Sequence, residues 1–381
     1  MLIDAASSSV TTNSNSNTTN TGIRSRWDPT LTSTRGSQII TDYIRQCMVW
    51  TGNSTIDYAV LTHFHNDHFG GYTSSLPKSA NSNTYSLIGF AEIFDNFKIG
   101  TLLDRGYPDY NYPFDMATMA DNAPSCNNYI NAVKWHVANQ KFDAAIFKAG
   151  ANNQIVQKYN PAKYPTAKVQ NVAVNGEIWT GSGTTTKKTF PELSEITYEN
   201  SKNITSSDNC PPENITSCVM KVSYGNFDFF AGGDLQYNGR SSHAWKDAEL
   251  PCAKAVGQVE LLKANHHGVT NTNQVDALKA LNPQTIVVNS WVDCHPRTDI
   301  LNSMETTLPA CDMFITNFWQ GDRPSGVDDR VTAEEAARVK GYDGHIVVRV
   351  TDGGNKYRVV TITDSDGAMT VKTISGPYTS R

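Results

Sequence analysis

Short apolar runs alternate with polar turns and with helical patterns along the whole chain. The runs at 58–61, 218–224, 227–231, 285–290, 345–350 and 357–363 are bounded by turn residues, as is typical of strands. Two of them flank Gly225-Asn226, which is a strong hairpin signal. Residues 37–50 and 128–147 instead place apolar side chains at helical spacing. Strands interleaved with helices predict an α/β fold built in layers.

The composition is that of a globular protein of low charge. The chain has 381 residues, a formal net charge of −5 and 18% charged residues, and its mean hydropathy is −0.43. No apolar run approaches the roughly 18 residues that a membrane span needs, and the first residues lack the pattern of a secretory signal. Residues 6–22 are rich in Ser, Thr and Asn, so we expect a low-complexity loop there. We expect a single domain over 1–381, and the low charge favours a secreted or periplasmic location.

The most informative stretch is 58–71, YAVLTHFHNDHFGG, in which a buried strand is followed by metal-binding residue types. On an extended backbone His63 and His65 point the same way, so they can hold one ion together. Asp67 and His68 follow where the chain turns, and they are placed to face a second ion. Imidazole nitrogen with carboxylate oxygen suits zinc, with manganese or iron as alternatives.

Three further groups with the same chemistry follow later strands. Asp234 ends a Gly-Gly-Asp turn after the predicted hairpin. His266 and His267 follow the strand pattern near residue 263, and neighbouring residues on a strand point to opposite sides, so we expect only one of them to be a ligand. His295 comes after the run at 285–290.

The ordered set of motifs is THxHxDHxGG, then Gly-Asp, then His-His-Gly, then His-Pro. This set resembles the metallo-β-lactamase superfamily, and within it the ComEC-type competence proteins and their stand-alone hydrolase relatives, among them the teichoic-acid phosphorylcholine esterases. The resemblance implies an α/β (α+β layered) fold, the metallo-β-lactamase-like αββα sandwich. Residues 107–206 match it poorly and are expected to be an inserted segment. The start, LIDA, is similar to a strand that in this superfamily follows an earlier strand. That earlier strand is missing here, so either the true start lies upstream or the protein lacks it.

The resemblance also implies a role for each residue of the motifs. It assigns His63 and His65 to one zinc ion, Asp67, His68 and His267 to a second ion, and Asp234 to both. It places His266 at the substrate phosphate, His295 in an outer or substrate-side position, and Asp4 behind the ligands, where a carboxylate orients them. Two departures stand out: Val269 replaces a Ser that usually follows the His-His-Gly motif, and His136 is the only histidine between the first motif and Asp234. We expect His136 to be a surface or core residue.

These assignments predict a binuclear zinc-dependent hydrolase, with a phosphodiester as the favoured substrate class. Two zinc ions about 3.5–4 Å apart would hold a hydroxide and clamp a phosphoryl group. Asp67 and His266 are the residues expected to take part in the chemistry itself. One alternative is a β-lactamase or lactonase that opens an amide or ester ring. The other is a non-catalytic metal-binding domain, although structural zinc sites usually close at four ligands.

The partner is expected to be a small-molecule or polyanionic phosphodiester, a class that includes nucleic acids, nucleotides and phospholipid-like headgroups. Residues 134–188 carry eight lysines against Asp143 and Glu177, a local net charge of +6. These lysines form either a solvated surface or a cationic rim for such a substrate. Of the seven cysteines, Cys210 and Cys218 are close enough in sequence to form a disulfide. The oligomeric state is left open.

Overall fold

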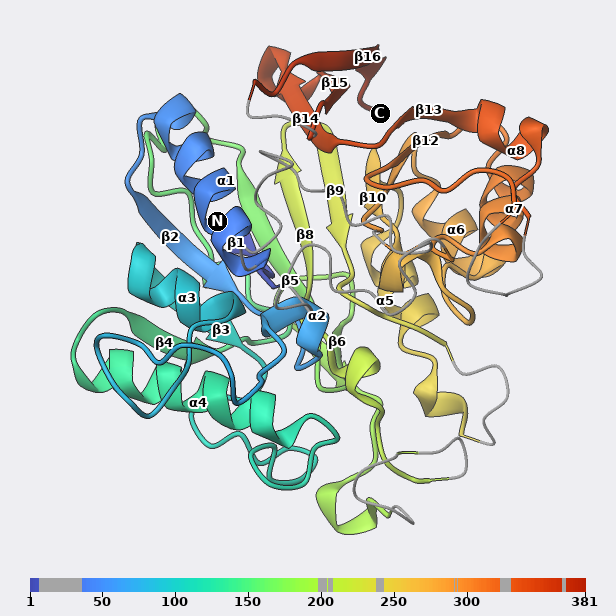
Figure 1. Cartoon of the computed structure of the whole chain (residues 1–381). Helices are drawn as coiled ribbons and strands as arrows, with labels where there is room; N and C mark the ends of the chain where they lie inside the picture. The colour runs from blue at the N-terminus through green and yellow to red at the C-terminus, as the bar shows by residue number, and fades with distance from the viewer. Residues whose placement is uncertain are drawn as a thin grey trace.

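The computed structural model describes residues 1–6, 36–197, 204, 208–237, 243–290, 292, 294–322, 330–364 and 368–381. The loop predicted at 6–22 therefore lies outside the described residues except for Ala6. Two β-sheets face each other, and helices cover the outer side of each sheet (Figure 1). This arrangement confirms the expected α/β fold, with layers in the order helix, sheet, sheet, helix.

The first sheet is entirely parallel. Its strands, in spatial order, are β1 (Leu2–Ile3), β2 (Thr55–Val60), β3 (Lys98–Asp104) and β4 (Asp143–Ile146). Its outer face is covered by α1 (Gly36–Thr51), α3 (Gly89–Asn96) and α4 (Ala123–Ala138), while the short α2 (Asn66–Phe69) lies at the end of β2. Parallel strands covered on both faces carry nearly continuous apolar runs, which explains why the run at 58–61 is so distinct.

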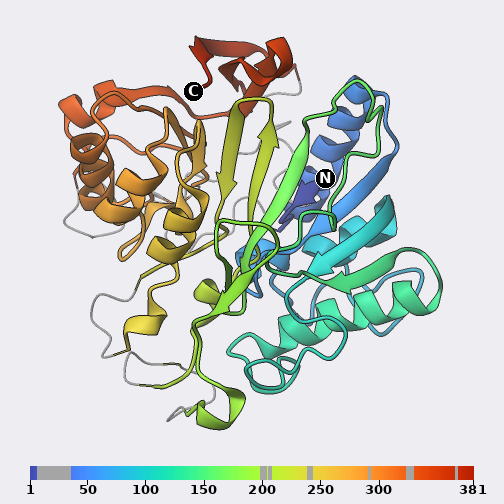
Figure 2. The same ribbon diagram turned by 180° about the vertical axis from the view of Figure 1, so that it is seen from behind.

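The second sheet is larger and mixed. Its strands, in spatial order, are β13 (Val339–Tyr342), β12 (Asp312–Ile315), β11 (Thr285–Val288), β10 (Leu261–Lys263), β9 (Phe227–Ala231), β8 (Val219–Tyr224), β5 (Lys168–Val174), β6 (Glu177–Trp179) and β7 (Thr186–Lys188). The helices on its outer side are α5 (Glu249–Val256), α6 (Val275–Leu281), α7 (Thr298–Thr307) and α8 (Ala333–Arg338). Seen from behind, the yellow-green strands β8 and β9 stand between the orange helices of this side and the blue and cyan helices of the other (Figure 2). The strands β9 to β13 run parallel, so their carboxyl ends meet at one edge.

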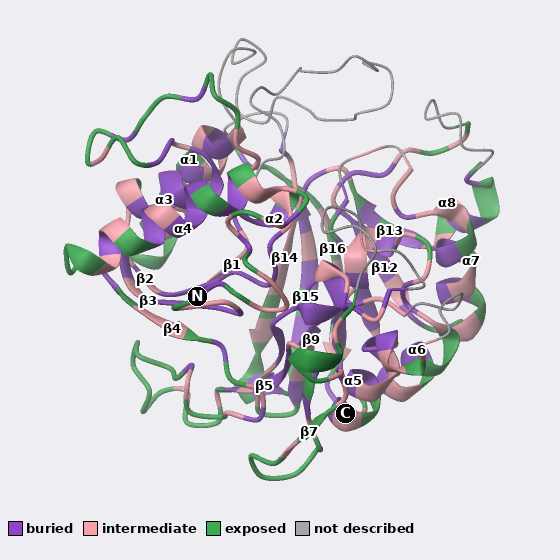
Figure 3. Cartoon of the chain, turned by 90° about the horizontal axis from the view of Figure 1, so that it is seen from below, coloured by how far each residue is buried: buried purple, intermediate pink, exposed green. Residues whose placement is uncertain are grey.

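Apolar side chains from both sheets fill the space between them. Tyr58, Val60 and Leu103 of the first sheet pack with Met220 and Ala231 of the second. Helices on both sides of the molecule carry buried residues beside exposed ones (Figure 3), as expected for amphipathic helices that cover a sheet. The two sheets therefore form a sandwich whose interior is apolar up to the strand ends.

A third, antiparallel sheet covers part of the second sheet. It consists of β14 (His345–Thr351), β15 (Lys356–Ile362) and β16 (Val371–Thr379). The first two are the alternating runs predicted near the C-terminus, whereas β16 is not among the strands predicted from the sequence. Tyr357 and Val359 of β15 pack against Phe227, Leu261 and Phe314. Short 3-10 turns complete the described elements: η1 (Leu193–Glu195), η2 (Glu213–Thr216), η3 (Ala244–Lys246), η4 (Asn265–Gly268) and η5 (Asp352–Gly354).

The structure corrects the helix that we predict at 128–147. The helix ends at Ala138, and residues 143–146 form β4, which pairs with β3. A short apolar run fits helix and strand equally well, and here the open edge of β3 decides between them. The poorly matched segment at 107–206 supplies strands to both sheets. Cys210 and Cys218 are both buried and both free, so the disulfide considered above is not formed.

Among the described residues, none of the helices has both the length and the apolar composition that crossing a bilayer requires.

Candidate metal centre

The predicted ligands come together where strands of the two sheets end. Residues 62–68 follow β2, Gly232 to Asp234 follow β9, and η4 follows β10. Ligand sites in α/β proteins lie at the carboxyl ends of parallel strands, because the loops there converge while the strands stay fixed. Gly233 allows this convergence: its φ is +58°, and a Cβ on it would lie 2.9 Å from Ser217 Cβ.

One group of four side chains has the spacing of a metal site. It consists of Asp67, His68, Asp234 and His267, and the atoms that each offers lie within 4.8 Å of one another. Asp234 Oδ2 lies 3.0 Å from His68 Nε2 and 3.2 Å from His267 Nε2. Asp67 Oδ2 lies 3.3 Å from His267 Nε2 and 3.6 Å from His68 Nε2. Tetrahedral zinc with bonds of about 2.0–2.1 Å would separate neighbouring ligand atoms by about 3.3 Å, so this group could hold one metal ion.

The first two histidines form a second group beside it. His63 Nε2 lies 3.1 Å from His65 Nδ1, as the two-residue spacing predicts. His63 Nε2 is also 3.9 Å from Asp234 Oδ2, so the same carboxylate oxygen faces both groups. His63 is buried, whereas His65 is half-buried and reaches the surface of a neighbouring cavity.

Buried polar atoms in this centre fit a bound cation. Asp234 Oδ1 is buried and accepts no hydrogen bond among the described residues, with the nearest cation, Lys263 Nζ, 3.6 Å away, and a buried polar atom without a hydrogen bond is costly. Without a metal, burial lowers the pKa of His267, but the charge of Asp234 outweighs this effect and raises that pKa to about 9. Because a metal must displace such a proton, metal binding here should weaken as the pH falls below about 9.

Residues behind the ligands hold the imidazole rings in place. Asp4 Oδ2 lies 2.8 Å from His68 Nδ1, and the other oxygen accepts a 2.8 Å hydrogen bond from the Thr62 amide. The Thr62 hydroxyl lies 3.0 Å from His63 Nδ1, and the carbonyl oxygen of Asn289 lies 2.6 Å from His267 Nδ1. Each of these three histidines therefore has one ring nitrogen held from behind and the other turned inward, the arrangement that fixes the tautomer of a metal ligand.

The Asp4→Ala variant is expected to bind zinc about 10–100-fold more weakly, because the orientation of His68 is lost. A competition titration with a chromophoric chelator measures this change. Asp57→Ala is the matched control, since Asp57 lies on the neighbouring strand at the opposite end of the sheet from the centre. Equal zinc affinity in the Asp4 variant and the wild type would remove the orienting role from Asp4.

A partly buried clamp on Phe64, made of hydrogen bonds to its backbone, fixes the turn between the first two histidines. Glu213 accepts a 2.6 Å hydrogen bond from the Phe64 amide, and Asn122 donates one of 2.7 Å to the Phe64 carbonyl. Glu213 also pairs with the buried Arg105, whose guanidinium lies 4.8 Å from the centre of the Phe64 ring. Sequence reasoning missed all three residues, because they are far apart in the chain and belong to no motif.

The adjacent histidines lie in a turn, which corrects the strand that we assumed for them. β10 ends at Lys263, and His266 (φ 44°) and His267 (φ 56°) both have left-handed backbone conformations. Hydrogen bonds from Asn265 to Glu249 (2.7 Å) and to the side chain of Asn273 (3.0 Å) hold this unusual turn.

As a result, both imidazoles approach Asp234. His266 Nε2 lies 3.9 Å from Asp234 Oδ2, against 3.2 Å for His267. His266 Nδ1 is 3.2 Å from the side-chain amide nitrogen of Asn214. His267 thus belongs to the group of four, as the resemblance implies, while His266 lies at its margin, towards His65.

The remaining sequence candidates lie outside the ligand group. The ring of His295 is parallel to that of His267 with centroids 5.9 Å apart, so His295 neighbours a candidate ligand. His136 is a buried core residue of α4, and its Nε2 lies 3.3 Å from Asp95 Oδ1. Lys263, which sequence reasoning passed over, lies 3.6 Å from Asp234 Oδ1 and so adds a positive charge beside this carboxylate.

The lysines at 134–188 do not line the cavity beside His65. Lys158 and Lys168 instead line a different cavity with Met1 and Asp57, near the amino end of β2. Since the candidate metal ligands follow the carboxyl end of β2, these two lysines lie at the opposite end of the sheet. This placement favours the interpretation of a solvated surface over that of a cationic rim.

Comparison with known proteins adds no further constraint: no protein-family model matches the chain, and no curated protein matches it.

Proposed function

We propose that this chain is a hydrolase with a two-metal centre of the metallo-β-lactamase kind, acting on phosphodiesters. The observation that carries the proposal is the position of Asp234, whose Oδ2 faces His68 and His267 on one side and His63 on the other. A carboxylate shared between two ligand groups is what a binuclear centre requires, whereas a closed structural zinc site needs only four ligands.

The residues divide between the two ions as the sequence motifs suggest. Asp67, His68 and His267 would hold one ion, His63 and His65 the other, and Asp234 both. Zinc in such a centre polarises a phosphoryl oxygen and brings the pKa of a bound water near neutrality. Asp67 is the most exposed residue of the group of four, with 42% of its side chain accessible, so it is the ligand most open to substrate.

His266 is the chain's own group for stabilising the developing charge. Burial lowers its pKa to about 4, so the imidazole is neutral at pH 7. Asn214 donates its amide hydrogen to His266 Nδ1, and the imidazole proton therefore resides on Nε2. An N–H group pointing into the centre can donate a hydrogen bond to a phosphoryl oxygen as negative charge builds up on it.

A substrate screen on the zinc-loaded protein tests the proposal. Bis-p-nitrophenyl phosphate is expected to be turned over, whereas nitrocefin and a simple lactone are expected to remain intact. Single-stranded DNA is expected to be a poor substrate, because no lysine or arginine is among the described residues that line the cavity beside His65. Release of p-nitrophenol, absorbance of opened nitrocefin and gel analysis of the DNA provide the measurements.

The Asp234→Asn variant, prepared with the same zinc treatment, controls for hydrolysis by free metal. Rapid opening of nitrocefin or the lactone without diester cleavage would support the ring-hydrolase alternative. Full zinc occupancy with no activity on any of these substrates would support a non-catalytic metal-binding domain.

A further inference from the structure

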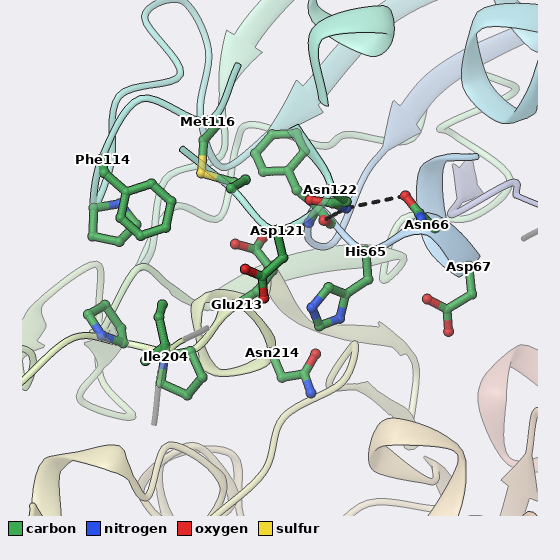
Figure 4. A pocket seen from close by; sticks show the side chains of 15 residues that line it. His65, Asn66, Asp67, Phe114, Met116, Asp121, Asn122, Ile204, Glu213 and Asn214 are labelled. Atoms are coloured by element: carbon green, nitrogen blue, oxygen red, sulfur yellow. Dashed lines mark hydrogen bonds between the residues drawn. The ribbon is translucent and has the colours of Figure 1, made fainter. Parts of the chain in front are cut away.

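A cavity of about 320 Å³ lies beside the metal centre and shares His65 and Asp67 with it. Its far wall comes from residues 113–122, in the connection between β3 and α4, and from residues 211–214 around the start of η2. Figure 4 shows His65, Asp121, Glu213 and Asn214 around the same space. A substituent on a phosphoryl group at the metal centre would therefore reach this cavity past His65.

The charged groups on the cavity wall are acidic. Asp67, Asp121 and Glu213 line it, and no lysine or arginine does so among the described residues. Glu213 is neutralised by Arg105 behind it, and Asp67 faces the metal group. Asp121 is exposed and makes no hydrogen bond or ion pair with another described residue. Partial burial raises the pKa of its carboxyl group and the nearby His65 opposes that rise, so Asp121 is the acidic group of the cavity wall that has no ion-pair partner of its own.

Asn214 adds a buried acceptor that has no donor. Its side chain is fixed, because the amide nitrogen donates to Gln236 Oε1 at 2.9 Å and to His266 Nδ1 at 3.2 Å. The residue is only 7% exposed, and its Oδ1 has no hydrogen-bond partner among the described residues. In Figure 4 this oxygen points towards the side of the cavity that holds His65. A ligand that supplies N–H donors would satisfy it.

We propose that this cavity binds a protonated amino group carried on one substituent of the phosphodiester. An ammonium group supplies three donors and a positive charge, which match the carboxylate of Asp121 and the amide oxygen of Asn214. Phe114 and Met116 line the same cavity and provide an apolar surface for the carbon atoms next to the nitrogen, and an aromatic ring also attracts a cation. A second phosphate group at this position would instead be repelled by the negative charge of Asp121. The inference rests on the proposed phosphodiesterase function and specifies its substrate class.

A pair of substrates with the same shape tests this inference. In both 2-aminoethyl 4-nitrophenyl phosphate and propyl 4-nitrophenyl phosphate, water adds its oxygen to phosphorus, the phosphorus–oxygen bond to the aryl group breaks, and 4-nitrophenolate leaves. The zinc-loaded protein is expected to show a kcat/KM about twofold to fivefold higher for the aminoethyl ester, the range for one exposed charge pair. Asp121→Asn should bring the ratio close to one.

Asp115→Asn is the matched control, because Asp115 is an exposed carboxylate of the same loop whose side chain bonds, among the described residues, to Ala117 and Thr118 and does not line the cavity. It should keep the wild-type ratio. An equal or higher kcat/KM for the propyl ester in the wild type would overturn the proposal.

A binding measurement separates this proposal from the proposed function. Calorimetric titration of the zinc-loaded protein with O-phosphorylethanolamine and with propyl phosphate needs no turnover. Tighter binding of the amino compound that disappears in Asp121→Asn supports the cavity assignment even if neither ester is hydrolysed. Equal binding of the two compounds contradicts it, whatever the activity.

Discussion

Replacing Asp234 with alanine is expected to remove most of the bound metal, whereas the wild-type protein is expected to carry close to two zinc ions per chain after zinc loading. Asp234 Oδ2 is the atom that faces both ligand groups, so its loss takes a ligand from each ion at once. It also leaves His68 and His267 without the carboxylate that they share. Activity on the diester should fall by at least about 10³-fold, since the centre supplies most of the stabilisation of the transition state.

Elemental analysis after zinc loading and desalting measures this loss. Asp228→Ala is the control, because Asp228 lies on the strand that leads to Asp234 but pairs with Lys221 outside the centre. That variant should keep about two ions per chain. A wild-type protein that holds one ion or none after zinc loading would contradict the binuclear centre, and an Asp234→Ala variant that retains both ions would contradict the bridging role.

The two adjacent histidines are expected to give different defects. His267→Ala should lose metal as well as activity, because His267 Nε2 lies 3.2–3.3 Å from the oxygens of Asp234 and Asp67. His266→Ala should keep its metal but lose turnover by about 10²–10³-fold, the usual cost of removing one donor to a developing negative charge.

Zinc content and kcat of the two single variants decide this assignment. His136→Ala serves as the control for removal of a buried histidine, since His136 is a buried residue of α4 and lies away from the candidate ligands. If His266→Ala loses metal while His267→Ala retains it, the roles of the two residues must be exchanged. If both lose metal, His266 is a ligand of the ion at His63 and His65.

The conformation of this histidine pair shows where sequence reasoning stops. From the sequence, one histidine was expected to point away from the metal because neighbours on a strand alternate. The structure places both in left-handed conformations, held by Glu249 and Asn273 through Asn265, so both imidazoles reach Asp234. A conformation that depends on hydrogen bonds from other elements is not encoded in the spacing of the two residues.

The sequence by itself determined the layered α/β class and the side chains of the first motif that are candidates for holding a metal ion. Apolar periodicity reports burial, and residues two apart after a strand share a side, so His63 and His65 are neighbours wherever the strand lies. Only the tertiary structure decided that Asp234 lies between the two ligand groups, that Glu213 and Asn122 clamp Phe64, and that Asp121 faces a cavity next to His65. These contacts join residues about 60 to 170 positions apart in the chain. The packing of the two sheets brings them together, and the spacing of residues within one motif carries no information about that packing.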